Sequence, residues 1–323
     1  MENVLMMQGA GRLMDVCAKV KRNERVLIVT DYQKVSIAEV IASAAHERGA
    51  DVVLTVMTKR ELDGAEPPEH VAAAMRSADV IFTPLTHSIT HSNATKEAIE
   101  SGARGIMLSA FIPDQLIEGG INGDFEKVEP LCTKVAKLLT NANSAHLTTP
   151  QGTNITMNLN NRPGNAHTGL AHSPGDFTTV PNIESSISPI EGSAKGVIVA
   201  DASIPYYNIG VLQEPVYYEV SNGKITNITG GMQAKQIASI MENVKNEAVY
   251  NIAQLAFGLN PECKMRGVML DDEGVYGTAH IGIGTSTLLG GKIKAPGHYD
   301  ALMWKPTLLL DGKTVLKDGE WII

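Results

Sequence analysis

The stretch "RVLIVTDYQKVSIAEVIASAAHERGADVVLTVM" (residues 25–57) decides the fold of the N-terminal half. Its two ends, 25–31 and 51–57, are short apolar runs rich in β-branched residues, which is typical of strands, and 25–31 reads as a buried one. Between them, apolar residues recur at helical spacing over 35–50, and a glycine stands at the end of that pattern. A strand–helix–strand unit of this kind predicts a parallel sheet with helices on its faces.

The same alternation continues along the next ninety residues or so. Apolar runs at 79–85 and 104–110 predict two further strands, and the spacing over 69–78, 93–103 and 124–142 predicts helices. We therefore expect residues 1–144 to form a Rossmann-like α/β domain. No G-x-G-x-x-G links a strand to a helix here, so we expect no nucleotide cofactor.

The character of the sequence changes near residue 145. Segments 145–164, 196–204, 216–231 and 307–323 read as strands joined by Asn-Gly, Asp-Gly and similar turns. A single helical region, in two pieces, is predicted over 232–258. Residues 145–323 are thus expected to form an α+β domain that is rich in antiparallel strands.

Composition narrows the functional class. The chain has 323 residues, 43% hydrophobic and 19% charged, with a formal net charge of −8. An acidic chain without a Lys/Arg cluster is a poor binder of nucleic acid or anionic membranes. Three scattered cysteines indicate a reducing compartment. Because neither a signal peptide nor an apolar run of membrane-spanning length is seen, we expect a cytoplasmic protein without a membrane partner.

Residues with metal-binding chemistry gather in the second half. His298 and Asp300 are two apart in a predicted strand, so they share a face. His280, in "GTAHIGIG", and the glutamates Glu184 and Glu273 are further candidates. Two histidines and a carboxylate can hold Fe²⁺, and with added glutamates Zn²⁺, Mn²⁺ or Co²⁺. The residues alone leave open a plainer interpretation, in which these are hydrogen-bonded or solvated side chains.

A second pair of histidines, His87 and His91, follows a predicted strand in "LTHSITHSNA". Loops at that edge of an α/β sheet often carry function, so both are candidates for substrate binding. The alternative is an ordinary helix start with Ser92 or Asn93 as the N-cap, and we favour this alternative.

Four segments of the second half, in order, resemble the metal-dependent aminopeptidases T and S: residues 175–204, 253–262, 271–284 and 297–312. Residues 83–107 of the first half resemble the same superfamily. The resemblance implies a homo-oligomer in which glutamates, histidines and an aspartate hold divalent metal ions. The matching residues here are Glu184, Glu273, His280, His298 and Asp300. Gln254 stands where the family has a glutamate shared by two metals, which opposes a two-metal site because an amide carries no charge.

Residues 247–261 and 275–300 are also similar to another branch of the superfamily, the Fe(II) ring-cleaving 2,5-dihydroxypyridine 5,6-dioxygenases. That branch uses two histidines and an aspartate, and His298 and Asp300 match two of the three. The third falls on Gln254, so His280 would have to supply the missing imidazole from a different strand.

We expect a metal-dependent hydrolase of an amide bond in a short peptide or in a small linear or cyclic amide. His280, His298 and Asp300 would bind the principal ion, and Glu184 and Glu273 would be further ligands or the catalytic base. Substrate binding is assigned to Gln254, His87 and His91. The alternative is a mononuclear Fe(II) dioxygenase acting on a hydroxylated N-heterocycle, and a non-enzymatic binding protein is the least favoured class.

Overall fold

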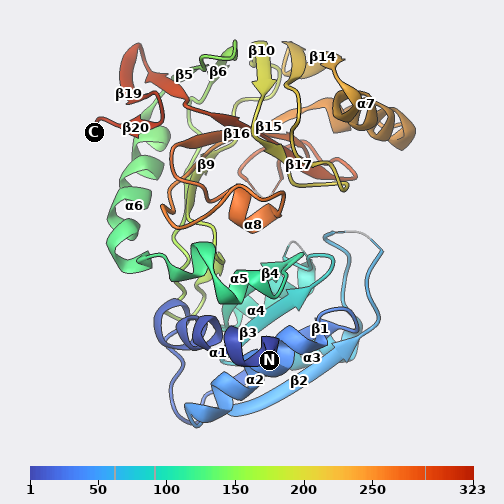
Figure 1. Cartoon of the computed structure of the whole chain (residues 1–323), viewed down its shortest axis with the longest axis vertical. Helices are drawn as coiled ribbons and strands as arrows, with labels where there is room; N and C mark the ends of the chain where they lie inside the picture. Colours follow the sequence, from blue (N-terminus) through green and yellow to red (C-terminus); the bar gives the residue numbers. More distant parts are fainter. Residues whose placement is uncertain (62, 91, 288) are drawn as a thin grey trace. The chain divides into compact units, whose positions relative to one another are not determined.

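The computed structural model describes residues 1–61, 63–90, 92–287 and 289–323 (Figure 1). The chain divides into two compact units, one made of Met1–Glu129 and His167–Ile183 and the other of Pro130–Ala166 and Glu184–Ile323. The chain therefore passes from one unit to the other three times. These bounds differ from a single division after residue 144, because 130–144 belongs to the second unit and 167–183 to the first.

The first unit contains a five-stranded sheet in the order β2-β1-β3-β4-β8. All of its pairings are parallel, as the alternating sequence pattern predicts. Four of the strands match the predicted runs, whereas β8 comes from the sequence beyond residue 145. The strands are β1 (Arg25–Asp31), β2 (Asp51–Met57), β3 (Val80–Leu85), β4 (Arg104–Ser109) and β8 (Phe177–Thr179).

The three helices predicted at 35–50, 69–78 and 93–103 begin and end close to the predicted positions, and the other helices of this unit were not predicted. Ser92 is the N-cap of α4, and its side chain accepts a hydrogen bond from the backbone N–H of Thr95. Apolar side chains such as Val29, Ile81 and Met75 form a core between strands and helices. The helices are α1 (Glu2–Arg12), a π-helical turn (Leu13–Cys17), α2 (Val35–Glu47), α3 (Glu69–Ser77), α4 (Asn93–Glu100), α5 (Asp114–Ile117) and a 3-10 helix (Gly119–Asn122).

The second unit contains two main sheets, one of eight strands and one of five. One has eight strands in the order β14-β13-β10-β6-β5-β18-β19-β20, and every pairing is antiparallel. Its strands are β14 (Lys224–Gly230), β13 (Val216–Ser221), β10 (Lys195–Ala200), β6 (Asn154–Asn158), β5 (Ser144–Thr148), β18 (Thr307–Leu310), β19 (Lys313–Lys317) and β20 (Glu320–Trp321).

The other sheet has the order β17-β16-β15-β9-β7. Its strands are β17 (His298–Trp304), β16 (Thr278–Gly284), β15 (Ile252–Gly258), β9 (Glu184–Ile187) and β7 (Gly164–His167). A short ladder joins β11 (Ser203–Ile204) to β12 (Gly210–Val211). One continuous apolar core contains side chains from both large sheets, among them Tyr218 and Ile281.

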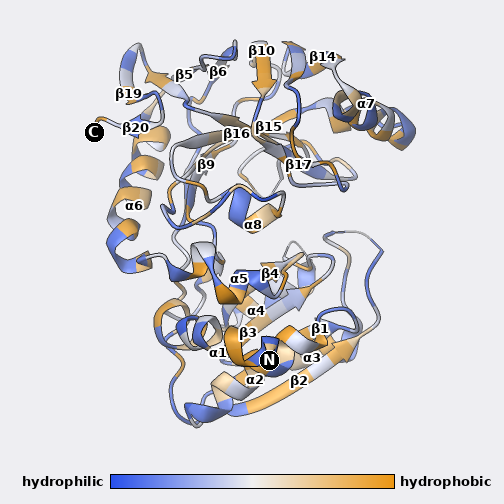
Figure 2. Ribbon diagram, in the orientation of Figure 1, coloured by the Kyte–Doolittle hydropathy of each residue, from blue (hydrophilic) through white to orange (hydrophobic). Residues whose placement is uncertain are grey.

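Helices complete this unit. The longest is α6 (Phe125–Asn141), whose residues alternate between hydrophobic and hydrophilic colours in Figure 2, as expected of a helix buried on one side. The others are α7 (Met232–Val244), a 3-10 helix (Glu247–Tyr250) and α8 (Met269–Asp272). Over the described ranges, no helix combines the length and the apolar character needed to cross a membrane.

The prediction of a helical region over 232–258 is wrong in its second part. The helix α7 ends at Val244, Lys245 takes the left-handed conformation with φ of 54°, and residues 252–258 form the strand β15. All seven residues of β15 are buried. A strand covered on both faces shows no polar–apolar alternation, so its apolar run does not distinguish it from a helix. The correction matters because it places Gln254 on a sheet.

Candidate metal centre

One face of the five-stranded sheet of the second unit carries most of the predicted site. In the antiparallel register of β16 and β17, His280 pairs with Leu302, Gly282 with Asp300 and Gly284 with His298. Alternate residues of a strand share a face, so His280, His298 and Asp300 lie on the same one. Their neighbours Ile281 and Tyr299 belong to the apolar core.

Two further strands bring polar groups to this face. Glu184 begins β9 and pairs with Gly258 of β15. Oε2 of Glu184 lies 3.3 Å from Nε2 of His280. Gln254 donates a hydrogen bond from Nε2 to the other oxygen of Glu184 at 3.3 Å. Glu184 is therefore held between an amide and an imidazole.

The donor atoms lie close together. Oδ1 of Asp300 is 3.4 Å from Nε2 of His298 and 4.0 Å from Nε2 of His280. Ligands bound about 2.0–2.2 Å from one ion stand about 3 Å apart when at right angles. Within the described residues, no group of three or more His, Cys, Asp or Glu side chains already stands at metal-binding spacing. The donor types suit a metal ion, and binding would draw these atoms together by up to about 1 Å.

The other ring nitrogen of His298, Nδ1, helps to orient Nε2 toward Asp300. Its Nδ1 lies 2.9 Å from the backbone carbonyl oxygen of Thr285. A carbonyl only accepts, so Nδ1 carries a hydrogen and, in the neutral ring, Nε2 presents its lone pair toward Asp300. Histidine ligands of metals are commonly held in this way. Nδ1 of His280 has no hydrogen-bond partner in the described part of the chain.

Gly282 makes room for this arrangement. A Cβ atom at position 282 would stand 2.7 Å from Nε2 of His298, 2.6 Å from its Cε1 and 2.7 Å from Cβ of Gln254. Such distances are too short for any side chain. Because Gly282 has no side chain, the His298 ring can lie over this position of β16.

Tyr206 and Glu273 join the cluster of His280, His298, Asp300 and Glu184 through the second oxygen of Asp300. The Tyr206 hydroxyl lies 2.8 Å from Oδ2 of Asp300 and 2.9 Å from Oε1 of Glu273. Tyr206 lies on the loop between β11 and β12, and Glu273 directly follows α8. Tyr206 was not predicted from the sequence, because this loop carries no motif. Adjacent tyrosines occur twice in the chain, at 206–207 and 217–218, so the pair does not single out Tyr206.

The two carboxyl groups that contact Tyr206 have opposite protonation preferences. Burial, together with the charges of Asp300 and Glu184, raises the pKa of Glu273 well above its usual value. Burial would also raise the pKa of Asp300, but the imidazoles of His298 and His280 outweigh it and lower that pKa. Asp300 is thus the more readily ionised of the two, and the Tyr206 hydroxyl, which has a single hydrogen, lies within donating distance of both carboxyl groups.

The histidines are affected in turn. Burial would lower the pKa of His280, but the carboxylates of Asp300 and Glu184 raise it above the usual value. The pKa of His298 is also raised, against burial, chiefly by Asp300. The carboxylates therefore favour the charged form of both imidazoles, which means that they favour a positive charge in their midst.

Two predicted site residues, His87 and His91, come from the first half of the sequence. His87 belongs to the first unit, and its Nδ1 is 3.6 Å from Oδ1 of Asp63. His91 lies outside the described residues. That both histidines bind substrate stays a prediction.

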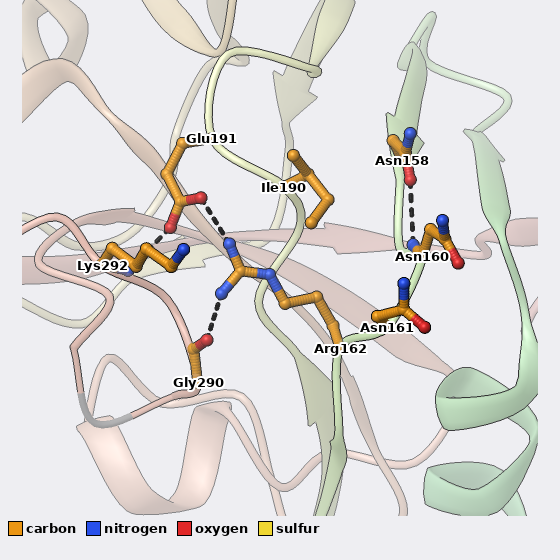
Figure 3. Close-up of a pocket in the computed structure, with 8 residues that line it drawn as sticks. All are labelled: Asn158, Asn160, Asn161, Arg162, Ile190, Glu191, Gly290 and Lys292. Carbon is orange, nitrogen blue, oxygen red and sulfur yellow. Dashed lines mark hydrogen bonds and ion pairs between the residues drawn. The ribbon is translucent and has the colours of Figure 1, made fainter.

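A separate pocket of about 470 Å³ lies in the second unit (Figure 3). None of the predicted site residues lines it; it is lined by Asn158, Asn160, Asn161, Arg162, Ile190, Glu191, Gly290 and Lys292. The buried guanidinium of Arg162 pairs with Glu191 and donates to the carbonyl of Gly290. The same glutamate accepts from the backbone N–H of Lys292 at 2.7 Å. These contacts join the three segments around the pocket.

With this geometry established, comparison with known proteins identifies the family. A model of the 2,5-dihydroxypyridine 5,6-dioxygenase family, NicX, matches residues 6–323. The chain belongs to this family. A protein of Pseudomonas putida KT2440 named 2,5-dihydroxypyridine 5,6-dioxygenase is 27% identical over 259 residues, which cover 76% of this chain and 72% of the relative.

Two solved structures share the fold. The 2,5-dihydroxypyridine dioxygenase of Pseudomonas putida KT2440 superimposes with a TM-score of 0.85 at 22% identity, covering 99% of this chain and 97% of the other. The aminopeptidase AmpT of Thermus thermophilus superimposes with a TM-score of 0.72 at 14% identity, covering 99% of each chain. At these identities the likeness concerns the fold.

The expectation of an amide hydrolase is therefore wrong. The family match extends over nearly the whole chain and names a ring-cleaving dioxygenase, so the chain is an enzyme of a dioxygenase family. The aminopeptidase resemblance reflects a fold that both classes of enzyme share.

Proposed function

We propose that this enzyme is a mononuclear iron(II) dioxygenase that cleaves the ring of a hydroxylated N-heterocycle of the 2,5-dihydroxypyridine class. The observation that carries the proposal is the approach of Nε2 of His280, Nε2 of His298 and Oδ1 of Asp300 on one sheet face. Two histidines and one carboxylate form the ligand set of many Fe(II) oxygenases. An Fe(II) ion held by three such groups keeps open positions for a ring substrate and for dioxygen.

Each side chain then has a distinct part. His280 and His298 present neutral nitrogen donors once their protons are displaced, and Asp300 supplies the negative charge. Glu184 would accept a proton from a substrate hydroxyl at Oε2, because Gln254 donates to its other oxygen. Glu273 is not proposed as a base, since its raised pKa makes its carboxyl group harder to ionise.

The expectations about substrate and partners from the sequence apply to this proposal with a more specific substrate. The substrate would be a small ring compound instead of a peptide, and Gln254, beside Glu184, would contact it. Nucleic acid is not a suitable partner for a chain with a net charge of −8. The partner protein that the superfamily resemblance implies is a second copy of this chain.

The test is metal analysis and oxygen uptake on anaerobically purified protein. We expect about one iron per chain and consumption of oxygen together with loss of 2,5-dihydroxypyridine absorbance. His298→Gln should lose both, whereas His46→Gln, at an exposed position of α2, should lose neither. Iron-loaded protein that consumes no oxygen with any dihydroxylated pyridine would contradict the proposal.

A further inference from the structure

We infer that Tyr206 is a positioning residue that fixes the orientation of the Asp300 carboxylate and so sets the metal affinity of the centre. The inference rests on the proposed function only in taking Asp300 as a ligand. Its basis is the hydrogen bond of 2.8 Å from the Tyr206 hydroxyl to Oδ2 of Asp300.

A carboxylate ligand needs such a contact. The last torsion of an aspartate side chain is broad, so its two oxygens exchange places easily unless one of them is held. Tyr206 holds Oδ2, and Oδ1 is the oxygen that faces the imidazoles of His298 and His280, at 3.4 and 4.0 Å. Without the hydroxyl, the carboxylate could turn both oxygens toward the histidines and give up the single-oxygen geometry.

Tyr206 is itself held from two directions. Oε1 of Glu273 lies 2.9 Å from the same hydroxyl, so the oxygen is fixed between two carboxyl groups. The ring packs against the main apolar core and lies 6.3 Å, centroid to centroid, from Tyr207. The backbone N–H of Ile209 donates to the Tyr206 carbonyl at 3.0 Å, which closes the loop that carries the ring. Little rotamer freedom is left to lose when the hydroxyl contacts Asp300.

The main test is Tyr206→Phe, which removes the hydroxyl and keeps the ring. We expect affinity for Mn²⁺, measured by anaerobic calorimetry on metal-free protein, to fall about 10- to 100-fold, as is usual when an outer partner of a ligand is lost. The electron paramagnetic resonance spectrum of bound Mn²⁺ should also broaden, because the carboxylate would then occupy more than one orientation. Tyr217→Phe is the matched control, since Tyr217 is 41% exposed on β13.

A second variant keeps the inference testable if Tyr206→Phe does not fold. Glu273→Ala leaves Tyr206 and Asp300 in place and releases the hydroxyl on one side. We expect a smaller loss of Mn²⁺ affinity, of a few-fold, with the same direction of spectral change. Wild-type affinity and an unchanged spectrum in both variants would overturn the inference.

The readouts separate this inference from the proposed function. Binding of Mn²⁺ and its spectrum require no turnover and no dioxygen. If wild-type protein binds metal but consumes no oxygen, the proposed function fails while the role of Tyr206 stands. If Tyr206→Phe binds Mn²⁺ as wild type does and also cleaves the ring at the wild-type rate, the proposed function stands and the role of Tyr206 fails.

Discussion

Protonation decides how single residues behave in the candidate centre. In the metal-free protein, the pKa values of His280, His298 and Glu273 are all raised, and the pKa of Asp300 is lowered. The three raised groups bind more protons in the folded than in the unfolded state over part of the pH range. Because all three act in the same direction, they make the stability of the metal-free protein depend on pH in a way that can be measured.

We predict that metal-free protein loses stability as the pH rises above about 6.5, the ordinary pKa of histidine. A raised histidine pKa contributes stability that is fully present below the unfolded value and is lost as the pH passes the folded value. The free energy of unfolding, measured by urea denaturation at several pH values, should fall over that range. The double variant His280→Gln, His298→Gln should show a flatter profile, and a wild-type profile that rises instead would contradict the prediction.

Gln254 gives the second prediction at this scale. Replacing its amide by a carboxylate would put a second negative charge beside Glu184, where a hydrogen bond of 3.3 Å now exists. We expect Gln254→Glu to bind more divalent metal per chain than wild type, because two close cations need that charge. Elemental analysis after dialysis against Mn²⁺ measures the ratio, with Gln236→Glu on the exposed side of α7 as control. An unchanged ratio would mean that position 254 does not govern the number of ions.

Among the elements, β16 is the one whose sequence is most constrained by the centre. It contributes His280 as a donor and Gly282 as the gap in which the His298 ring lies. A larger residue at 282 has to displace both Gln254 and His298. The sequence of β16 is therefore restricted at two positions, because 280 must carry a donor side chain and 282 must carry none.

Gly282→Ala should consequently remove metal binding and lower stability. The added Cβ would stand 2.7 Å from both Nε2 of His298 and Cβ of Gln254, so both side chains must shift. Overpacking of this kind costs about 1–3 kcal/mol. Urea denaturation and Mn²⁺ calorimetry measure the two effects. Gly11→Ala, where the nearest atom is the flexible end of Arg48 at 3.1 Å, should change neither by much.

The elements also show what could be predicted from the sequence and what could not. The parallel strands β1 to β4 were predictable because each apolar run is separated from the next by an amphipathic helix. The H-x-D pair was placed on one face because β17 is a strand of period two. The strand β15 was predicted as helix because burial on both faces removes its period, so the contact of Gln254 with Glu184 could not be foreseen. The contact of Tyr206 with Asp300 joins positions 94 apart and depends on tertiary structure alone.

For the whole molecule, fold and reaction have to be judged separately. The two-part α/β architecture follows from periodicity and turn chemistry, and the aminopeptidase AmpT has the same fold. The hydrolase expectation failed because residues with the same ligand chemistry can serve either reaction on that fold. The family match over residues 6–323, and not the ligand types, distinguishes the two classes.

The distribution of the donors along the chain gives a prediction for the whole molecule. The donor set spans positions 184 to 300 and meets only in the assembled sheet, so a metal ion should bind the folded state far better than the unfolded one. Free metal at 100 times the dissociation constant should stabilise the protein by about 2.7 kcal/mol. Chelation should lower Tm correspondingly in wild type. A Tm of His298→Gln that shifts as much as that of wild type would contradict this account.

The interleaving of the two units constrains the order in which the chain can fold during synthesis. The sheet of the first unit ends with β8, residues 177–179, although its other four strands have all been made by residue 109. Before β8 leaves the ribosome, residues 130–166 of the second unit have already been made and must wait for partners from 184 onward. Each unit therefore holds an unfinished edge while the other is being translated. A nascent chain halted between residues 145 and 176 would present the open edge of β4 to chaperones, or to other chains with exposed strands.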